Sequence, residues 1–380
     1  MRISRAFHPR RGRPMALPSL LKRCLRFRLL WGLLSGLTTL STLSFLASGG
    51  HEVLLSGSLP YLLDSGGHHP LSAPLLPSSE DFLLQPPPEA CSPRPPSLLV
   101  LVTSAPEHTA QRQAVRDTWG GVRWAGDYTV RTFFTLGLPP EPSRQAALER
   151  EAAGHRDIIQ GRFMDTYRNL TLKTLALLGW ATTHCSGALF LLKADDDVFL
   201  NLPALVEHLQ RSEGTSVRPD RDPNSHHHVP ASLYPEGVFP PYCSGTAYVL
   251  SGDSLAAILG AARHVPLIPV EDVFVGLCTR RAGLAPKHLA RMAGSAHVPP
   301  DPCCYREVMF GVHQVAPAEM VAMWDEAGPR EKPCSLVQRA LGLLRCKALS
   351  YLLTQPGRSL AAPSAEATES AGGEGTREAI

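Results

Sequence analysis

Three consecutive aspartates, Asp195, Asp196 and Asp197, interrupt an apolar run and constrain the fold of this chain more than any other feature. The apolar residues on either side of them, 189–192 and 198–200, predict a buried strand and its exit. Adjacent like charges repel, and a site relieves that repulsion by taking up a proton or a cation. Turns and helix caps also use aspartate, but a triplet between two apolar runs is harder to explain in that way. The pattern favours a cation site at the end of a buried strand.

The distribution of charge argues against nucleic-acid binding. The 380-residue chain carries 37 Lys and Arg against 34 Asp and Glu, but nine of the basic residues lie within residues 1–28, which contain no acidic residue. The rest of the chain therefore has 28 basic and 34 acidic residues, a net charge of −6. We expect no nucleic-acid partner for such a surface. The hydrophobic content of 44% suits a globular protein with a sizeable core.

A charge-free span follows the basic amino terminus. Residues 29–47 contain no charged side chain, and their number is close to what a membrane-spanning helix needs. Basic residues on the amino-terminal side alone predict that this end stays in the cytosol. The sequence therefore predicts a cytosolic tail over 1–28 and a single-pass signal anchor over 29–47, with the remainder lumenal. A cleaved signal peptide ending near Ala47 is the alternative, although its charged and apolar regions would both be long.

Cysteine usage agrees with a lumenal location. Eight cysteines follow the span, an even number that suits disulfides in an oxidising compartment, although the sequence cannot choose the pairing. These are Cys91, Cys185, Cys243, Cys278, Cys303, Cys304, Cys334 and Cys346. The absence of a CxxC pair argues against zinc. Asn169 lies in an Asn-Leu-Thr sequon and is a candidate glycosylation site.

Alternating strand and helix patterns predict an α/β domain with a largely parallel sheet over residues 97–355. Residues 48–96 hold ten prolines without strand or helix periodicity, which is typical of a stem, and the small polar residues of 356–380 predict a disordered tail. Strands are expected at 98–102, at 129–136 and before the aspartates, and helices from Thr109 to the Gly120-Gly121 pair, at about 143–154 and at 170–184.

Ligands of open α/β sheets gather at the carboxyl ends of strands, and two such ends are polar here. One is the turn after Val102, followed by Arg112 and Arg116, which lie one helical turn apart. The other is the aspartate triplet. Arginines and a carboxylate-bound metal together suit a diphosphate. Alternatively, the two arginines are solvated surface charges.

Five motifs in the chain occur in the order in which the β-1,3-glycosyltransferases of glycosyltransferase family 31 carry them. They are RQAVRDTWG, FMDTYRNLTLKT, KADDDVFLN, YCSGTAYVLS and EDVFVG. The chain resembles this family over residues 97–350. The resemblance implies a GT-A-type nucleotide-sugar-binding domain with a central, mostly parallel sheet. It also implies a Golgi membrane location with type II topology, which agrees with the predicted anchor.

Two further stretches, PLIPVEDVFVGLCTRRAGLAP and PDPCCY, resemble the family members that extend ganglio-series glycolipids. The resemblance implies an inverting enzyme that moves galactose from UDP-galactose to a terminal N-acetylgalactosamine. Glycoprotein glycans or N-acetylglucosamine ends are alternative acceptors, and a non-catalytic binding protein of the secretory pathway is an alternative function. The segment 211–237 is shorter than in related enzymes and contains three histidines, 226–228, which leaves the acceptor preference open.

The resemblance also implies roles for single residues. The triplet corresponds to the DxD motif of the family, which holds Mn²⁺ or Mg²⁺ against the donor diphosphate, and carboxylate oxygens suit those ions. We assign Asp197 to the metal together with His313, with His297 as the alternative histidine. The residues assigned to the donor are Arg112, Arg116, Asp165, Tyr167, Lys173, Asp195 and Asp196.

The base is expected in the acidic pair Glu271-Asp272, and we assign it to Asp272. Inversion at the anomeric carbon requires a group that removes the proton of the attacking hydroxyl. A carboxylate at this position could instead cap a helix beginning at Val273. An aspartyl-phosphate phosphatase also uses a strand-end DxD, but Phe199 stands where its motif requires Thr or Val.

Overall fold

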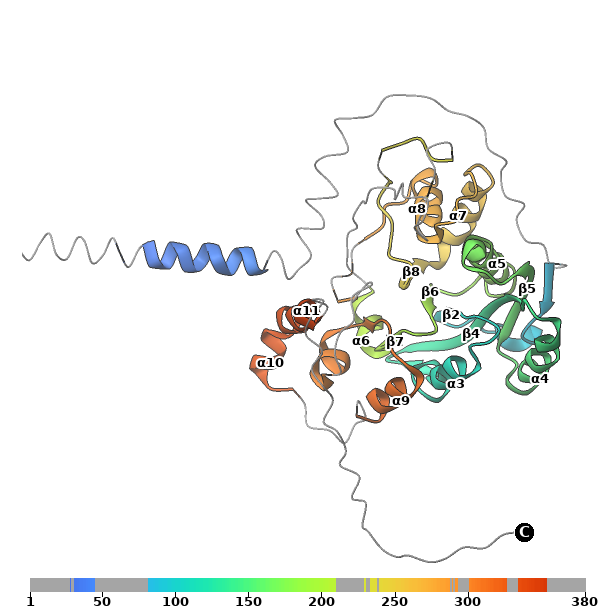
Figure 1. Cartoon of the computed structure of the whole chain (residues 1–380), viewed down its shortest axis with the longest axis horizontal. Helices are drawn as coiled ribbons and strands as arrows, with labels where there is room; N and C mark the ends of the chain where they lie inside the picture. Colours follow the sequence, from blue (N-terminus) through green and yellow to red (C-terminus); the bar gives the residue numbers. More distant parts are fainter. Residues whose placement is uncertain are drawn as a thin grey trace, which may run out of the picture.

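The computed structural model describes residues 28, 31–44, 81–209, 229, 233–237, 239–287, 289, 291–292, 301–326 and 334–353. Residues 31–44 are helical (Figure 1). In this described part of the chain, no helix combines the length and the apolar character of a bilayer-spanning segment. The signal anchor over 29–47 stays a prediction. Residues 48–80 of the expected stem, the tail 356–380 and the histidines 226–228 lie outside the described residues.

A seven-stranded sheet forms the centre of the folded domain, in the order β1-β5-β4-β2-β6-β8 with β3 paired to β4 (Figure 1). The strands are β1 (Phe82–Leu84), β2 (Leu98–Thr103), β3 (Trp124–Ala125), β4 (Tyr128–Leu138), β5 (Ile158–Met164), β6 (Phe190–Asp195) and β8 (Ala247–Ser251). The central strands β5, β4, β2 and β6 are parallel, whereas β1, β3 and β8 pair antiparallel to their neighbours. The predicted α/β domain with a mostly parallel sheet is confirmed.

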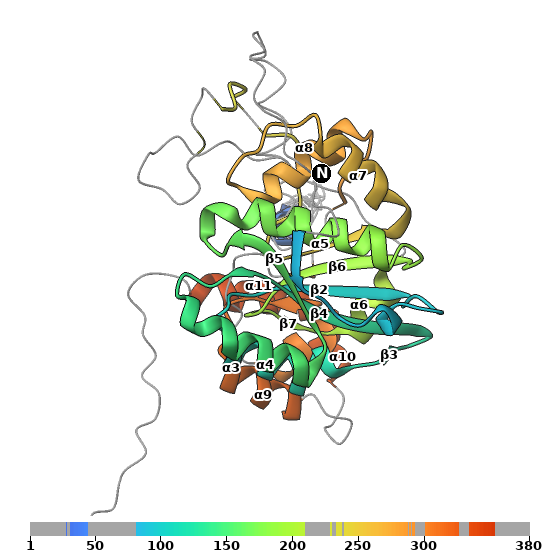
Figure 2. The same ribbon diagram turned by 90° about the vertical axis from the view of Figure 1, so that its right-hand side faces the viewer.

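Helices cover both faces of the sheet (Figure 2). One face carries α5 (Leu170–His184), α7 (Leu255–Ala262) and α8 (Glu271–Arg281), and the other carries α3 (Thr109–Asp117), α4 (Gln145–His155) and α9 (Pro317–Glu326). Side chains of β2 alternate between the two cores. Leu99 and Leu101 pack in the core beneath α5, whereas Leu98, Val100 and Val102 pack in the core beneath α3. A strand that is covered on both faces requires such a continuous apolar sequence.

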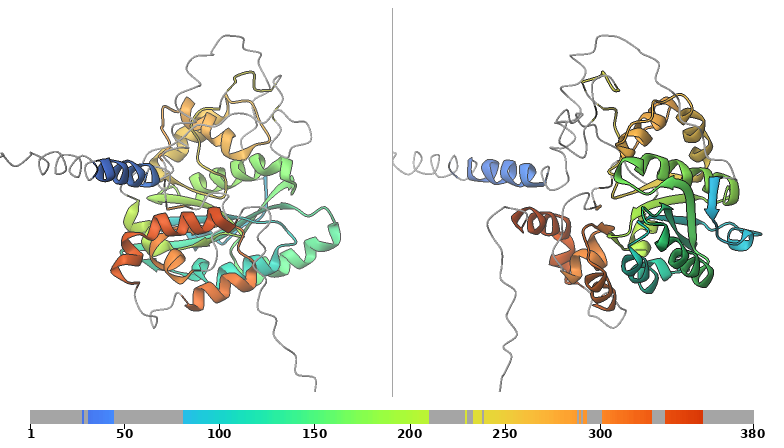
Figure 3. Two further views of the ribbon diagram at one scale, coloured as in Figure 1. Left: turned by 60° about the vertical axis from the view of Figure 1, so that its left-hand side comes forward. Right: turned by 45° about the vertical axis from the view of Figure 1, so that its right-hand side comes forward.

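The carboxyl-terminal part of the domain brings distant segments together. Strand β7 (Phe199–Leu200) pairs antiparallel with β9 (Gly311–Val312) in a separate two-stranded sheet. The remaining helices are η3 (Pro88–Ala90), η4 (Trp119–Gly121), η5 (Pro142–Arg144), η6 (Tyr167–Asn169), α6 (Leu202–His208), η7 (Gly252–Ser254), the π-helical turn η8 (Cys304–Val308), α10 (Leu336–Ala340) and α11 (Gly342–Leu353). Figure 3 shows the carboxyl-terminal helices, drawn orange to red, on the side of the sheet opposite to α7 and α8.

Three disulfides tie the domain together: Cys91–Cys185, Cys303–Cys334 and Cys304–Cys346. Among the described residues, Cys243 and Cys278 are free thiols. Six of the eight cysteines are therefore paired, as the expected oxidising environment suggests.

The expected stem over 48–96 contains residues that belong to the folded domain. Strand β1 pairs with β5, and Cys91 is bonded to the end of α5 through Cys185. Residues 82–91 must therefore be reassigned from the stem to the domain. The proline-rich composition concealed a strand of three residues, which is too short to show a period in the sequence.

Candidate active site

The aspartate triplet begins at the carboxyl end of β6, where two other segments meet it. The N–H of Asp195 donates to the carbonyl of Thr246 at 3.0 Å, which places the start of the antiparallel strand β8 at the same edge of the sheet. The pairing of β7 with β9, in register from Phe199 to Val312, brings the residue after Val312 beside the triplet. The fold therefore joins the predicted metal residues from two distant parts of the chain.

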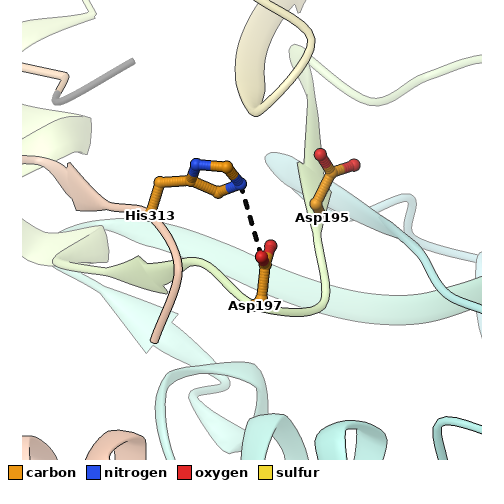
Figure 4. A group of neighbouring side chains, drawn as sticks. All are labelled: Asp195, Asp197 and His313. Atoms are coloured by element: carbon orange, nitrogen blue, oxygen red, sulfur yellow. Dashed lines mark ion pairs between the residues drawn. The ribbon is translucent and has the colours of Figure 1, made fainter. Parts of the chain in front are cut away.

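Asp195, Asp197 and His313 form a candidate cation site, which we call the metal group (Figure 4). Their ligand atoms all lie within 4.8 Å of one another. His313 Nε2 is 3.3 Å from Asp197 Oδ2, and the N–H of Val315 donates to the carbonyl of Asp197 at 2.9 Å. Two carboxylates and an imidazole are a donor set that fits a divalent cation. Asp195, which the sequence assigned to the donor, joins the metal group, while His297 lies outside the described residues.

The imidazole of His313 is held in a strongly acidic environment. Burial opposes its positive charge, but the hydrogen bond to Asp197 and the charge of that carboxylate outweigh burial and raise the pKa of His313. Nδ1 of the ring is buried and has no hydrogen-bond partner among the described residues. A cation and a proton therefore compete for the same acidic position, because a histidine must be neutral to bind a metal.

One oxygen of Asp195 is held from two sides. Oδ1 accepts hydrogen bonds from Thr103 Oγ1 at 2.5 Å and from Lys193 Nζ at 2.6 Å. Lys193 is 4% exposed, also donates to the carbonyl of Gly245, and lies 3.9 Å from Glu271 Oε2. Burial disfavours its charge, but Asp195 and Glu271 outweigh burial and raise the pKa of Lys193. Sequence reasoning missed this lysine, although residues two apart on a strand share a face.

Asp196 faces away from the metal group. It is buried, and its Oδ2 accepts a hydrogen bond from Ser104 Oγ at 2.6 Å and pairs with His108 Nδ1 at 2.9 Å. The hydrogen bond to Asp196 raises the pKa of His108. The structure therefore brings Asp196, which was assigned to the donor, to the loop after β2. Nothing in the sequence indicated that His108 would meet the triplet.

Asp165 and Lys173, both assigned to the donor, form a buried ion pair that ties three strand ends together. Lys173 Nζ is 2.8 Å from Asp165 Oδ1 and donates to the carbonyl of Ser104 at 2.6 Å. Asp165 Oδ2 accepts from the N–H of Gly137 at 2.6 Å. Because these residues lie at the carboxyl ends of β2, β4 and β5, the pair fixes the edge where the donor is expected. The ion pair lies at the sheet edge where the sequence predicted a donor site, but both of its side chains are buried.

The structure does not bring Arg112 and Arg116 together with the metal group. Arg112 is fully buried, pairs with Glu151 at 2.7 Å and donates to the carbonyl of Ala105 at 2.5 Å. Arg116 pairs with Glu151 and with Asp157, each at 2.8 Å. Asp157 precedes β5, at the end of the sheet opposite to the carboxyl edge. We therefore reassign both arginines from donor contacts to a scaffold role between α3, α4 and the loop after β2.

The acidic pair at the start of α8 divides into a buried and a partly exposed carboxylate. Glu271 is 8% exposed, and its Oε1 accepts from Thr174 Oγ1 at 2.9 Å and from the hydroxyl of Tyr248 at 2.8 Å. Asp272 is only partly buried, and its Oδ2 accepts from the N–H of Gly245 at 3.1 Å. The N–H of Val273 donates to Asp272 Oδ1 at 2.8 Å. Glu271 is therefore an internal group, whereas Asp272 keeps part of its surface exposed.

Tyr167 lies close enough to Asp272 and Asp195 for both charges to affect its phenol. Its side chain is 48% exposed, and burial, followed by the charges of Asp272 and Asp195, raises the pKa of its phenol. Of the side chains assigned to the donor, Tyr167 offers the most exposed surface at this edge. Asn169 follows it at the start of α5, where Nδ2 donates to the carbonyl of Met164 at 2.9 Å. Glycosylation of Asn169 stays a prediction.

This arrangement combines two chemical capacities at one edge of the sheet. A divalent cation held by the metal group would neutralise the charge of an anionic ligand. Asp272, a partly exposed carboxylate whose two oxygens each accept a backbone N–H, can accept a proton. Together they suit a transfer reaction in which an anionic group leaves as a hydroxyl attacks.

Comparison with known proteins identifies the family. A family model described as galactosyltransferase matches residues 110–290. Beta-1,3-galactosyltransferase 4 of Rattus norvegicus is 41% identical over 350 residues, covering 80% of this chain and 93% of that protein. The Homo sapiens protein of the same name is 40% identical over 356 residues, covering 80% and 93%.

Other matches extend the range of donor sugars among the relatives. The Homo sapiens acetylgalactosaminyl-O-glycosyl-glycoprotein beta-1,3-N-acetylglucosaminyltransferase is 42% identical over 253 residues, covering 60% of this chain and 65% of that protein. Among solved structures, the apo WbbM bifunctional glycosyltransferase has a TM-score of 0.29 and 9% identity, covering 50% of this chain and 38% of that chain. The sequence relatives, which match over most of their length, confirm the family resemblance. The chain belongs to the galactosyltransferase family and is a hexosyltransferase.

Proposed function

We propose that the chain is an inverting β-1,3-galactosyltransferase of the GT-A type, which moves galactose from UDP-galactose to a terminal N-acetylgalactosamine of a ganglio-series glycolipid. The observation that carries the proposal is that the metal group and Asp272 lie at one sheet edge, with Gly245 between them. The relatives named beta-1,3-galactosyltransferase 4 support the donor sugar and the linkage. The acceptor rests on the resemblance of residues 266–286 and 300–305.

The reaction is a single in-line displacement, because a β-linked product forms from an α-linked donor. The acceptor hydroxyl attacks the anomeric carbon, and Asp272 takes its proton as the new carbon–oxygen bond forms. The bond between the anomeric carbon and the diphosphate oxygen breaks, and its electron pair leaves with UDP. Mn²⁺ or Mg²⁺ in the metal group supplies charge stabilisation for the diphosphate when it is bound.

The chain's own residues supply the orientation that this displacement requires. Thr103 and Lys193 hold Oδ1 of Asp195, which leaves its second oxygen for a cation. The N–H of Gly245 holds Oδ2 of Asp272. The half-exposed ring of Tyr167 offers an apolar face beside both acids, a surface on which a sugar ring can pack. Such orientation lowers the entropic part of the barrier.

The proposed location is the Golgi membrane, with the catalytic domain in the lumen and type II topology. The charge-free span over 29–47 and its basic amino-terminal flank support it. The three disulfides support an oxidising compartment. We expect the full-length protein to remain with membranes after alkaline carbonate extraction, and residues 97–350 to resist protease in sealed vesicles. A soluble product beginning near residue 49 would instead establish the cleaved signal peptide.

The test of the proposed activity is a matrix of donors and acceptors. The full-length chain is incubated with UDP-galactose, UDP-N-acetylglucosamine or UDP-glucose, and with acceptors that end in N-acetylgalactosamine or N-acetylglucosamine on lipid or peptide. We expect galactose transfer to the lipid ending in β-linked N-acetylgalactosamine, loss of transfer in excess chelator, and recovery with Mn²⁺. Preference for UDP-N-acetylglucosamine, for N-acetylglucosamine ends or for peptide acceptors would overturn the corresponding part. Absence of both transfer and donor hydrolysis would support a non-catalytic protein.

A further inference from the structure

A continuous chain of contacts joins the metal group to the proposed base. Lys193 Nζ holds Asp195 Oδ1 at 2.6 Å and also donates to the carbonyl of Gly245. The N–H of the same glycine donates to Asp272 Oδ2 at 3.1 Å. Lys193 and Gly245 therefore connect a carboxylate of the metal group with the carboxylate of Asp272. We call this connection the Lys193–Gly245 link.

We infer that Lys193 is a positioning residue, which fixes the spacing between the metal-binding carboxylate of Asp195 and the proton-accepting carboxylate of Asp272. The inference rests on the proposed function for the role of Asp272. The contact between Lys193 and Asp195 does not depend on that role, because it belongs to the geometry of the metal group. An in-line displacement makes this spacing important, because the leaving group and the attacking hydroxyl lie on opposite sides of one carbon atom.

The surroundings of Lys193 explain why a lysine is needed. Its side chain is 4% exposed and lies 3.9 Å from the buried carboxylate of Glu271, in addition to its contact with Asp195. An ammonium group has three donors, and its oxygen neighbours come from the end of β6 (Asp195), the segment before β8 (Gly245) and the start of α8 (Glu271). A shorter or uncharged side chain would leave the buried Glu271 and the partly exposed Asp195 without a cation between them. The lysine is thus the cation between Asp195 and Glu271, and it reaches Asp272 through Gly245.

Gly245 offers an independent way to disturb the same link. A Cβ at this position would lie 3.2 Å from Glu271 Oε2 and 3.4 Å from Asp272 Oδ2. Gly245→Ala therefore crowds the two acids of α8, whereas Lys193 and its contact with Asp195 remain. Lys193→Met removes the charge at the other end while keeping an unbranched side chain. The two variants approach the link from opposite sides.

The experiment measures metal binding and transfer separately in the full-length protein. Mn²⁺ affinity is determined from the electron paramagnetic resonance signal of free Mn²⁺, with and without UDP, and kcat and KM are determined with UDP-galactose. Replacement of a group that orients a metal ligand typically weakens metal affinity or activity by about 10- to 100-fold. We expect Lys193→Met to weaken both to this extent, and Lys193→Arg to recover part of the Mn²⁺ affinity. Gly245→Ala should lower kcat and leave Mn²⁺ affinity unchanged.

A double-mutant cycle and a stability control decide the interpretation. If Lys193 and Gly245 act through one link, the effects of Lys193→Met and Gly245→Ala on kcat will be less than additive. Ile258→Ala removes a buried aliphatic side chain of α7 and leaves every charged group in place, so it should lower the melting temperature without changing Mn²⁺ affinity. Wild-type Mn²⁺ affinity in Lys193→Met, or additive effects on kcat, would overturn the inference. Failure of the proposed function alone would appear as weakened Mn²⁺ binding in Lys193→Met with no transfer by the wild type.

Discussion

Two groups of charged side chains in this domain differ in how their charges are balanced. Between α3 and α4, Arg112 and Arg116 face Glu151 and Asp157, so that two cations meet two anions, which we call the paired cluster. At the carboxyl edge, the carboxylates of Asp195, Asp197, Glu271 and Asp272 gather around Lys193 and His313, which we call the acidic edge.

The difference separates scaffold from site. A buried charge that already has its counter-charge gains nothing from a ligand, and removing its partner costs stability. A group with more carboxylates than cations lowers its free energy by binding a cation. From the sequence alone, the arginines suggested donor contacts or solvated surface charges, and the aspartate triplet suggested a cation site with further donor contacts. The balance of charge, which depends on tertiary contacts, distinguishes the paired arginines from the carboxylates that gather at the candidate metal group.

The largest effect is expected at Asp272, on the acidic edge. Asp272→Asn keeps the shape of the side chain but removes the proton acceptor, and loss of a general base typically lowers the rate by about a hundred- to ten-thousand-fold. The fall should appear in kcat, with UDP affinity nearly unchanged, because the lost interaction belongs to the transition state. Steady-state kinetics and UDP titration measure the two quantities.

Glu271→Gln is the companion variant at the neighbouring buried position. Glu271 is hydrogen-bonded to Thr174 and Tyr248, so Glu271→Gln should lower the free energy of unfolding. The kcat per folded molecule should fall much less than in Asp272→Asn. If Asp272→Asn instead lowers only the melting temperature while kcat survives, Asp272 stabilises the first turn of α8, where it accepts the N–H of Val273, and is not the base.

The next largest effect is expected at His313, in the metal group. Substitution of a residue that only supports a metal ligand costs about 10- to 100-fold in affinity, so His313→Ala should weaken Mn²⁺ binding at least this much. Asp196→Asn is the matched comparison, because Asp196 is adjacent to both metal carboxylates yet faces Ser104 and His108. Calorimetric titration of Mn²⁺ into both variants checks the difference. Equal losses would show that Asp196 belongs to the metal group after all.

Substitutions in the paired cluster should change the free energy of unfolding and leave the kinetics of transfer unchanged. Burial raises the pKa of Glu151, but the hydrogen bonds and charges of Arg112 and Arg116 outweigh burial and lower it from its ordinary value of 4.5. Glu151→Gln should reduce the free energy of unfolding by about 1.5–3 kcal/mol near neutral pH, the usual contribution of hydrogen bonds to charged groups. Donor KM should stay unchanged, because the cluster does not reach the metal group.

The lowered pKa also fixes the direction of the pH dependence. A carboxylate with a depressed folded-state pKa contributes stability above its unfolded-state pKa, and that contribution is lost as the pH falls through the folded-state value. The difference in unfolding free energy between wild type and Glu151→Gln should therefore be constant above about pH 5.5 and shrink below about pH 4.5. Urea unfolding at a series of pH values measures it. A difference that grows as the pH falls would contradict the assigned pairing.

Much of this architecture follows from local sequence, and the remainder depends on contacts between distant segments. Helix α5 has the predicted limits of 170 and 184, and β2 extends the predicted strand by one residue, because apolar runs bounded by polar turns are strong local signals. The orientation of Asp196 toward His108 was not predictable, because it depends on the loop after a parallel neighbour strand. The role of Lys193 depends in the same way on the register between β6 and β8. Local patterns identify which residues are polar at an edge, but not which of them face one another.

The smallest expected effect concerns two residues in left-handed backbone conformations, one in each region. Gln314 follows the metal residue His313 and has a φ of 61°, and Arg156 ends α4 beside the paired cluster with a φ of 57°. A left-handed conformation costs a residue with a side chain about 1–2 kcal/mol, and glycine avoids this cost while losing about 0.5–1 kcal/mol through its more flexible unfolded state. Arg156→Gly should therefore raise the free energy of unfolding by up to about 1 kcal/mol and leave Mn²⁺ affinity unchanged.

Gln314→Gly should raise the free energy of unfolding by a similar amount, but it should weaken Mn²⁺ binding slightly, because the backbone after His313 becomes less restricted. Urea unfolding and Mn²⁺ titration of the two variants measure both quantities. If Gln314→Gly leaves Mn²⁺ affinity at the wild-type value, the position of His313 is maintained by its contact with Asp197 and by the bond from Val315, without a contribution from the conformation of Gln314.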